Sequence, residues 1–106
     1  MRNMEKKSKI ITICGSLKFK NEMIKAAIQM ELAGNVVLIP IFSTGDDKDT
    51  YTEEEITILG KMHKEKIKLS DAILIVNING YIGNSTKSEI NYAKALNKEI
   101  LYLEQI

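Results

Sequence analysis

The chain has 106 residues, fifteen of them basic and fourteen acidic, and 44% of the sequence is hydrophobic. This length and balance predict one globular domain, and the formal net charge of +1 argues against the broad basic surface that binds a nucleic acid polymer. No apolar run reaches the roughly 18–20 residues that cross a membrane, so no membrane partner is expected.

The chain begins with polar, lysine-rich residues. Residues 1–8 are expected to form a flexible leader without the cleavage site of a secretory signal, and residues 9–106 a single domain. The single cysteine, Cys14, cannot form an internal disulfide, which favours a cytoplasmic protein. Because the chain has only one histidine beside it, no zinc site is expected, and neither is another metal or a cofactor.

Four apolar, strand-like segments alternate with three helical patterns. Strands are expected at residues 9–14, 36–42, 71–77 and 99–103, and Pro40 places the second strand at the edge of its sheet. This alternation predicts parallel strands with helices on both faces, and right-handed crossovers give the strand order 2-1-3-4. The fold class is therefore α/β: a three-layer α/β/α arrangement with a flavodoxin-like or Rossmann-like parallel sheet of four strands, and three helices.

Each helical pattern has one apolar face. The first helix should end at Gly34, the second should start at a capping box of Thr52 and Glu55, and the third should cover residues 89–97. A lone histidine on such a face, like His63, is more often a packed core residue than a catalyst. The inward-facing residues are expected to be Met23, Ala26, Ala27 and Met30; Ile56, Leu59, Met62 or His63, and Ile67; and Ile90, Ala93 and Leu96 or Asn97.

In sheets of this kind, ligands bind beyond the carboxyl ends of the strands, where the winding reverses. For the order 2-1-3-4 this point lies between the first and third strands, so the loops at residues 14–19 and 77–88 should meet there. These loops are also the richest in glycine and hydroxyl groups. The polar loop after the second strand is interpreted either as a solvated loop or as a lid that supplies an acid to a leaving base; its acids are Asp46, Asp47 and Asp49.

The first of the two loops lacks the GxGxxG fingerprint of dinucleotide-binding proteins. Gly15 would let the backbone approach a ligand, and Ser16 would either cap the following helix or bind a hydroxyl or phosphate. The second loop leads to Glu89, for which the local sequence leaves two interpretations. Thr86 and Glu89 have the spacing of a capping box, which is a structural role. Alternatively, the positive end of the helix keeps Glu89 ionised, as a nucleophile that attacks a sugar requires.

Three segments carry a resemblance to a known family. The first is the turn at residues 13–17 (ICGSL), and the second is His63 followed by the strand at residues 71–76 (DAILIV). The third runs over residues 83–93 and continues at 97–101 (NKEIL). In this order and spacing, the segments are similar to the nucleoside 2-deoxyribosyltransferase-like family, which includes the 2'-deoxynucleoside 5'-monophosphate N-glycosidases. The resemblance covers nearly the whole chain.

This resemblance implies an enzyme that cleaves or transfers the N-glycosidic bond of a (deoxy)nucleoside or its 5'-monophosphate by a retaining double displacement. Glu89 would be the nucleophile, and no cofactor or metal would be needed. The implied partners are a small-molecule nucleoside or nucleotide and further copies of the chain in a dimer or larger homo-oligomer. The residues expected to bind substrate are Cys14, Gly15, Ser16, Lys66, Asn77, Gly80, Tyr81, Gly83, Ser85 and Thr86.

One departure from the family keeps a second hypothesis open. Lys66 stands where the related N-glycosidases carry an aspartate, and a lysine there would bind phosphate or accompany a loss of catalysis. The alternative to an enzyme is therefore a non-catalytic module that binds or senses a nucleotide with the same fold. An assembly protein without a ligand is a third hypothesis, which the glycine-rich loops disfavour.

Overall fold

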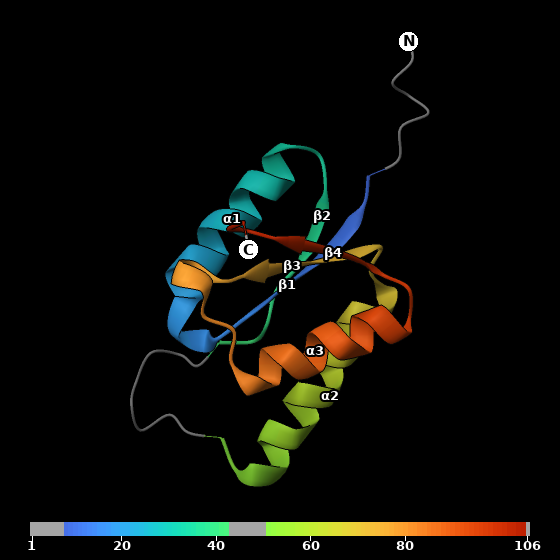
Figure 1. Cartoon of the computed structure of the whole chain (residues 1–106). Helices are drawn as coiled ribbons and strands as arrows, with labels where there is room; N and C mark the ends of the chain where they lie inside the picture. Colours follow the sequence, from blue (N-terminus) through green and yellow to red (C-terminus); the bar gives the residue numbers. More distant parts are fainter. Residues whose placement is uncertain (1–7, 43–50, 106) are drawn as a thin grey trace.

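The computed structural model describes residues 8–42 and 51–105. Their central element is a parallel sheet made of β1 (Ile10–Gly15), β2 (Val36–Leu38), β3 (Ala72–Val76) and β4 (Glu99–Tyr102). The strand order is β2-β1-β3-β4 (Figure 1), which confirms the expected topology and the edge position of β2. The winding therefore reverses between β1 and β3, at the centre of the sheet.

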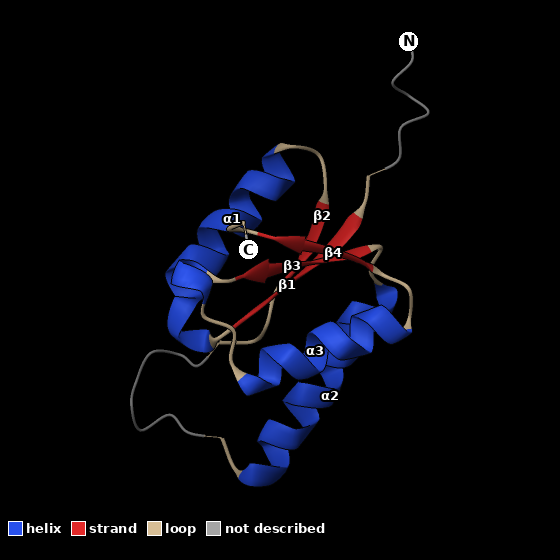
Figure 2. Ribbon diagram, viewed as in Figure 1, coloured by secondary structure: helices blue, strands red, loops and turns tan. Residues whose placement is uncertain are grey.

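Three α-helices cover this sheet in the described part of the chain: α1 (Lys20–Leu32), α2 (Glu53–Leu69) and α3 (Asn84–Ala95). α1 packs on one face of the sheet, and α2 and α3 pack together on the other (Figure 2). This arrangement is the expected three-layer α/β/α fold. Among the described residues, no helix combines the length and the apolar character of a membrane span.

Successive residues of β1 and β3 point to opposite faces of the sheet, and this alternation divides the interior into two cores. The core against α1 contains Ile11, Ile13, Met23, Ala26, Ala72, Leu74 and Val76. The core against α2 and α3 contains Cys14, Ile67, Ile73, Ile75, Ile90 and Ala93. The thiol of Cys14 therefore faces α2 and α3 and not α1.

The C-terminal turn of α2 is fastened to β1 by buried hydroxyl groups. Thr12 Oγ1 donates to the carbonyl oxygen of Lys66 at 3.1 Å, and Ser70 Oγ donates to the same oxygen at 2.7 Å. Thr12 and Ser70 are both almost fully buried, and buried hydroxyls without partners would destabilise the fold. The hydroxyl of Thr12 also hydrogen-bonds to that of Ser70, and the two contacts of Thr12 fix the register of α2 against β1. This register includes His63, which lies one helical turn before Lys66.

Three local expectations are corrected by the structure. β2 ends at Leu38 instead of continuing to residue 42, since Pro40 has no N–H for a strand ladder. α3 begins at Asn84, well before the expected start at Glu89. In α2, Ile56 is 57% exposed instead of buried, because the first half of this helix extends beyond the strands (Figure 1), and of the alternatives Met62 and His63 it is His63 that faces inward.

Candidate active site

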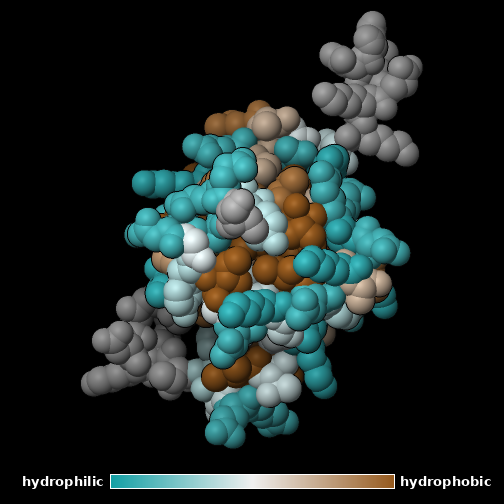
Figure 3. Space-filling model, viewed as in Figure 1, coloured by the Kyte–Doolittle hydropathy of each residue, from teal (hydrophilic) through white to brown (hydrophobic). Residues whose placement is uncertain are grey.

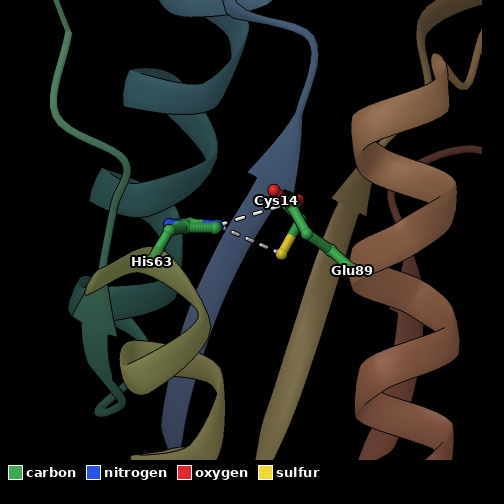
Figure 4. A group of neighbouring side chains, drawn as sticks. All are labelled: Cys14, His63 and Glu89. Atoms are coloured by element: carbon green, nitrogen blue, oxygen red, sulfur yellow. Dashed lines mark hydrogen bonds and ion pairs between the residues drawn. The ribbon is translucent and has the colours of Figure 1, made fainter. Parts of the chain in front are cut away.

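Three side chains of different chemistry meet between β1, α2 and α3. Figure 4 shows the imidazole of His63 pointing from α2 toward Cys14 on β1 and Glu89 on α3. His63 Nε2 lies 3.5 Å from Cys14 Sγ and 3.8 Å from Glu89 Oε1. The thiol, the imidazole and the carboxylate lie within 4.8 Å of one another. Such a group of titratable side chains at the carboxyl end of a central strand is a candidate functional site.

Local periodicity places each of the three side chains on the same side of the sheet. Cys14 is the last residue of β1 but one and alternates with the α1-facing Ile13. His63 precedes the buried Ile67 by four residues and so shares its helix face. Glu89 precedes Ala93 by four residues and is held inward in the same way, with its side chain 19% exposed.

Glu89 has no capping role. The N-cap of α3 is Gly83, which makes no side-chain capping bond, and Thr86 is already inside the first helical turn. Glu89 is the sixth residue of α3, so it lies beyond the orphan N–H groups that a capping box satisfies. The capping interpretation is therefore wrong.

Burial, and not the helix N-terminus, dominates the protonation of Glu89. Burial raises the pKa of its carboxyl from the ordinary 4.5 to about 7, against smaller opposing effects of a hydrogen bond from Cys14 and the positive charge of Lys64. The expectation that the helix end keeps this group firmly ionised is thus wrong, because the dipole effect fades within the first turn. Near neutral pH the acid and the carboxylate are both populated.

His63 and Cys14 are uncharged at neutral pH. Burial lowers the pKa of His63 to about 4, with a further contribution from the positive charge of Lys66. Burial raises the pKa of the Cys14 thiol well above its usual range, and the charge of Glu89 raises it further. The contact between His63 and Glu89 is therefore not an ion pair at neutral pH. His63 Nδ1 is buried without a hydrogen-bond partner among the described residues.

The two loops at the reversal of the winding do meet, as the topology predicted. Lys18, in the loop after β1, places Nζ 3.6 Å from the centroid of the Tyr81 ring, which belongs to the loop after β3. Phe19 packs edge to face on the same ring, with centroids 5.9 Å apart. Such cation–π and aromatic contacts hold the two loops against each other.

The glycine that ends β1 and the serine after it have structural roles. A Cβ at Gly15 would lie 3.1 Å from the carbonyl oxygen of Val76 and 3.5 Å from Met23 Sδ, so the glycine permits close packing of β1, β3 and α1. Ser16 Oγ accepts a hydrogen bond from the backbone N–H of Lys18 at 3.4 Å and caps the short 3₁₀ turn Leu17–Phe19. Capping was one of the two interpretations of Ser16.

The polar groups of Asn77 and Lys66 are engaged within the protein. Asn77 is fully buried; its amide donates to the carbonyl of Glu104 at 3.1 Å and accepts from the N–H of Glu104 at 2.9 Å. Lys66 Nζ donates to the carbonyl of Ile39 at 2.7 Å, beyond the end of β2. Both side chains therefore tie neighbouring segments to the carboxyl edge of the sheet.

The rest of the predicted binding set lies along the loop after β3 and the start of α3. Tyr81 is 46% exposed, Ser85 is exposed, and Gly80 adopts a φ of +80° that favours glycine. Thr86 is buried instead, with 2% exposure. Asp46, Asp47 and Asp49, the acids of the possible lid, lie outside the described residues.

His63 is the functional candidate that the sequence argument did not select. Its place on an apolar stripe predicts a packed core residue, and it is indeed buried, at 7% exposure. Two sequence signals were available. His63 lies four residues before the apolar Ile67, and Cys14 lies near the end of β1, so the side chains of His63 and Cys14 can face the same side of the sheet. Two surface hollows of about 210 Å³ each are lined by other residues: Tyr51, Glu55, Ile58 and Leu59; and Ile24, Ala27, Ile28, Glu31, Val37 and Ile39.

Comparison with solved structures identifies a similar fold in a 2-desoxiribosyltransferase from Leishmania mexicana. The two structures match with a TM-score of 0.64 and 24% sequence identity, over 89% of this chain and 63% of that chain. The present chain thus spans less than two thirds of that protein, and the likeness at this identity shows the fold. No protein-family model and no curated protein matches the sequence.

Proposed function

We propose that this protein cleaves or transfers the N-glycosidic bond of a nucleoside or nucleoside 5'-monophosphate, with Glu89 as the nucleophile. The observation that carries the proposal is the placement of a partly buried carboxyl group, free of any capping role, beside the reversal point between β1 and β3. The similarity in fold to an enzyme named as a 2-desoxiribosyltransferase supports the same class of substrate.

The proposed reaction has two displacements at the anomeric carbon. A carboxylate oxygen of Glu89 forms a bond to this carbon while the bond to the base nitrogen breaks, and the base leaves with the electron pair and takes up a proton. Water or a second base then attacks the same carbon from the face that the first base left. The carboxylate departs, and the configuration of the sugar is retained.

The surroundings of Glu89 tune this reaction. The thiol of Cys14 is a hydrogen-bond donor next to the carboxyl group, and such a bond favours the ionised form. The attacking species is the carboxylate, and burial raises the pKa of Glu89 to about 7. The rate of base release should therefore increase as the pH rises through about 7 and level off above it. A pH–rate profile measures this, and a rate that falls over that range would instead make Glu89 a proton donor.

The two contacting loops supply the proposed binding surface for the substrate. Tyr81 presents an exposed ring for the base, and Lys18 holds a positive charge against that ring. Lys18, the exposed Lys87 and the hydroxyl of Ser85 favour a substrate that carries a phosphate. Equal turnover of a deoxynucleoside and its 5'-monophosphate would argue against this preference.

Free base released from a panel of deoxynucleosides and their 5'-monophosphates, measured by chromatography, tests the proposal. The wild-type chain is compared with Glu89→Gln and with Glu65→Gln, which changes an exposed glutamate of α2. Release by wild type and Glu65→Gln but not by Glu89→Gln is the expected result. Equal release by Glu89→Gln would remove Glu89 from the proposed role.

A non-catalytic nucleotide-binding module is the second candidate function. Lys66 stands at the position of the family's aspartate. Its ammonium group donates a hydrogen bond to the Ile39 carbonyl, and the position supplies no carboxylic acid for a leaving base. This hypothesis predicts thermal stabilisation by a nucleoside monophosphate without release of base. Base release by the wild-type chain would exclude it.

A homo-oligomer in the cytoplasm is also part of the proposal. Ile28 and Leu32 on α1 and Val36 on the edge strand β2 are 53%, 84% and 48% exposed. The face drawn in Figure 3 likewise has hydrophobic patches between hydrophilic side chains. Exposed apolar groups of this kind favour association between copies, which sedimentation would measure.

The free, buried Cys14 is compatible with a reducing compartment, such as the cytoplasm.

A further inference from the structure

We propose that Cys14, His63 and Glu89 form a binding site for a divalent zinc-like metal ion. The three side chains present sulfur, nitrogen and oxygen, which are the three donor atoms that proteins use for Zn²⁺. This inference goes beyond the proposed glycosidic activity and does not rest on it, because the same side chains would bind the ion whether or not the protein turns over a nucleoside.

The distances between the donors fit a single ion. Zn–S bonds of about 2.3 Å and Zn–N and Zn–O bonds of about 2.0–2.2 Å at tetrahedral angles put the ligand atoms roughly 3.3–3.6 Å apart. Cys14 Sγ and His63 Nε2 are 3.5 Å apart, and His63 Nε2 and Glu89 Oε1 are 3.8 Å apart. The third pair, Cys14 Sγ and the Glu89 carboxylate, lies within 4.8 Å. To bring it to the tetrahedral spacing, the Glu89 side chain must rotate so that its oxygen moves toward Cys14 by up to about 1 Å.

The three ligands come from rigid elements. Cys14 lies in a central strand, His63 in α2 and Glu89 in α3. Thr12 of the same strand fixes the end of α2 by its hydrogen bonds to the Lys66 carbonyl and the Ser70 hydroxyl. A site held by strands and helices loses little conformational freedom on binding. Binding would displace the proton of the Cys14 thiol and any proton on Glu89 into the solvent. The resulting thiolate and carboxylate would together neutralise the charge of the ion in this position.

His63 supports the assignment by its orientation. Its side chain is more than nine-tenths buried, and Nε2 points between the other two donors (Figure 4). Its second nitrogen, Nδ1, has no partner among the described residues. Ligating histidines usually donate from this nitrogen to a second group, and loss of that group weakens metal affinity by about 10- to 100-fold. We therefore expect reversible binding, with the fourth position of the ion open to water.

Cobalt(II) is the probe for this site, because four-coordinate Co²⁺ absorbs strongly in the visible and its thiolate bond adds a near-ultraviolet charge-transfer band. The metal-free full chain is titrated with Co²⁺ under anaerobic conditions. We expect both signals to saturate at one equivalent and to disappear when Zn²⁺ is added. Because the chain has a single cysteine, a thiolate band in the wild-type protein can come only from Cys14, and no Cys14→Ser variant is needed to assign it. Absence of this band would overturn the proposal.

Variants assign the remaining ligands. Glu89→Gln and His63→Ala should each weaken Co²⁺ binding at least tenfold, whereas Glu65→Gln should bind like the wild type. Equal binding by all variants would also overturn the proposal. The two proposals fail separately: base release in the presence of EDTA tests the enzyme, and the cobalt spectrum tests the site. If both hold, Zn²⁺ should inhibit base release, because the ion occupies the Glu89 carboxylate.

Discussion

The two cores of this protein differ in chemistry although they share one sheet. The core against α1 is built from aliphatic residues and Met23, and it holds no titratable side chain. The opposite side buries Thr12, Cys14, His63, Ser70 and Thr86 and half-buries Glu89. Burying a titratable group destabilises the folded state, whereas burying hydrocarbon stabilises it. The α1 side therefore stabilises the fold, and the α2–α3 side carries groups whose protonation and reactivity burial has altered.

The largest effect should come from the reactive side of this comparison. Glu89→Gln keeps the shape of the side chain but removes the attacking oxygen, so base release should fall by roughly 10³-fold or more. Steady-state rates of the variant and of Glu65→Gln measure the difference. A loss of less than tenfold would mean that the α2–α3 side is not where the chemistry occurs.

On the α1 side, Ile13→Ala should lower the free energy of unfolding by about 2–5 kcal/mol, because it opens a cavity at a fully buried position. Denaturant unfolding at several pH values measures the loss. We expect the loss to be nearly independent of pH, since the α1 core holds no titratable group. A strongly pH-dependent loss would show that the two sides are coupled.

Titration of the α2–α3 side should shape the stability of the whole domain. For Glu89 the folded pKa of about 7 exceeds the ordinary 4.5, so the unfolded chain loses this proton first and stability falls as the pH rises from about 4.5 to about 7. For His63 the folded pKa of about 4 lies below the ordinary 6.5, so stability falls as the pH drops from about 6.5 to about 4. Together, Glu89 and His63 favour a maximum of the free energy of unfolding between about pH 4.5 and pH 6.5.

Glu89→Gln isolates one of these contributions. As the pH rises from acidic to mildly alkaline, the free energy of unfolding of the variant should increase by about 2–3 kcal/mol relative to that of the wild type, because glutamine never ionises. Denaturant unfolding across this range measures the gain, with Glu65→Gln as the exposed control. A gain of the same size in Glu65→Gln would contradict the role of burial.

The smallest effect is expected from the bonds that position α2. Thr12→Val keeps the shape of the side chain but removes the hydroxyl that donates to the Lys66 carbonyl, at a cost of about 1 kcal/mol. Thr57→Val is the matched control, because it removes a similar bond to the Glu53 carbonyl at an exposed position of α2. A smaller loss for Thr12→Val than for Thr57→Val would argue that α2 is not fastened through β1.

Much of the fold could be predicted from local sequence. The apolar run that contains Ile13 and the run at residues 72–76 are strands because β-branched residues dominate them, and the edge position of β2 follows from Pro40. The capping box of Thr52 and Glu55 is formed as expected. The boundary of one helix is the exception: the sequence predicts a start at Glu89, whereas α3 begins at Asn84. That shift moved the glutamate away from the helix end and into a buried position.

The sequence by itself determined the alternation of strands and helices, the parallel sheet, the order of its strands and the two loops that meet at its centre. These features follow from side-chain periodicity and from the handedness of crossovers, which act locally. Only the tertiary structure decided that Cys14, His63 and Glu89 share one small volume, since this depends on how two helices sit against one strand. It also decided their protonation, because burial depends on the packing of all three elements and no short stretch of sequence specifies it.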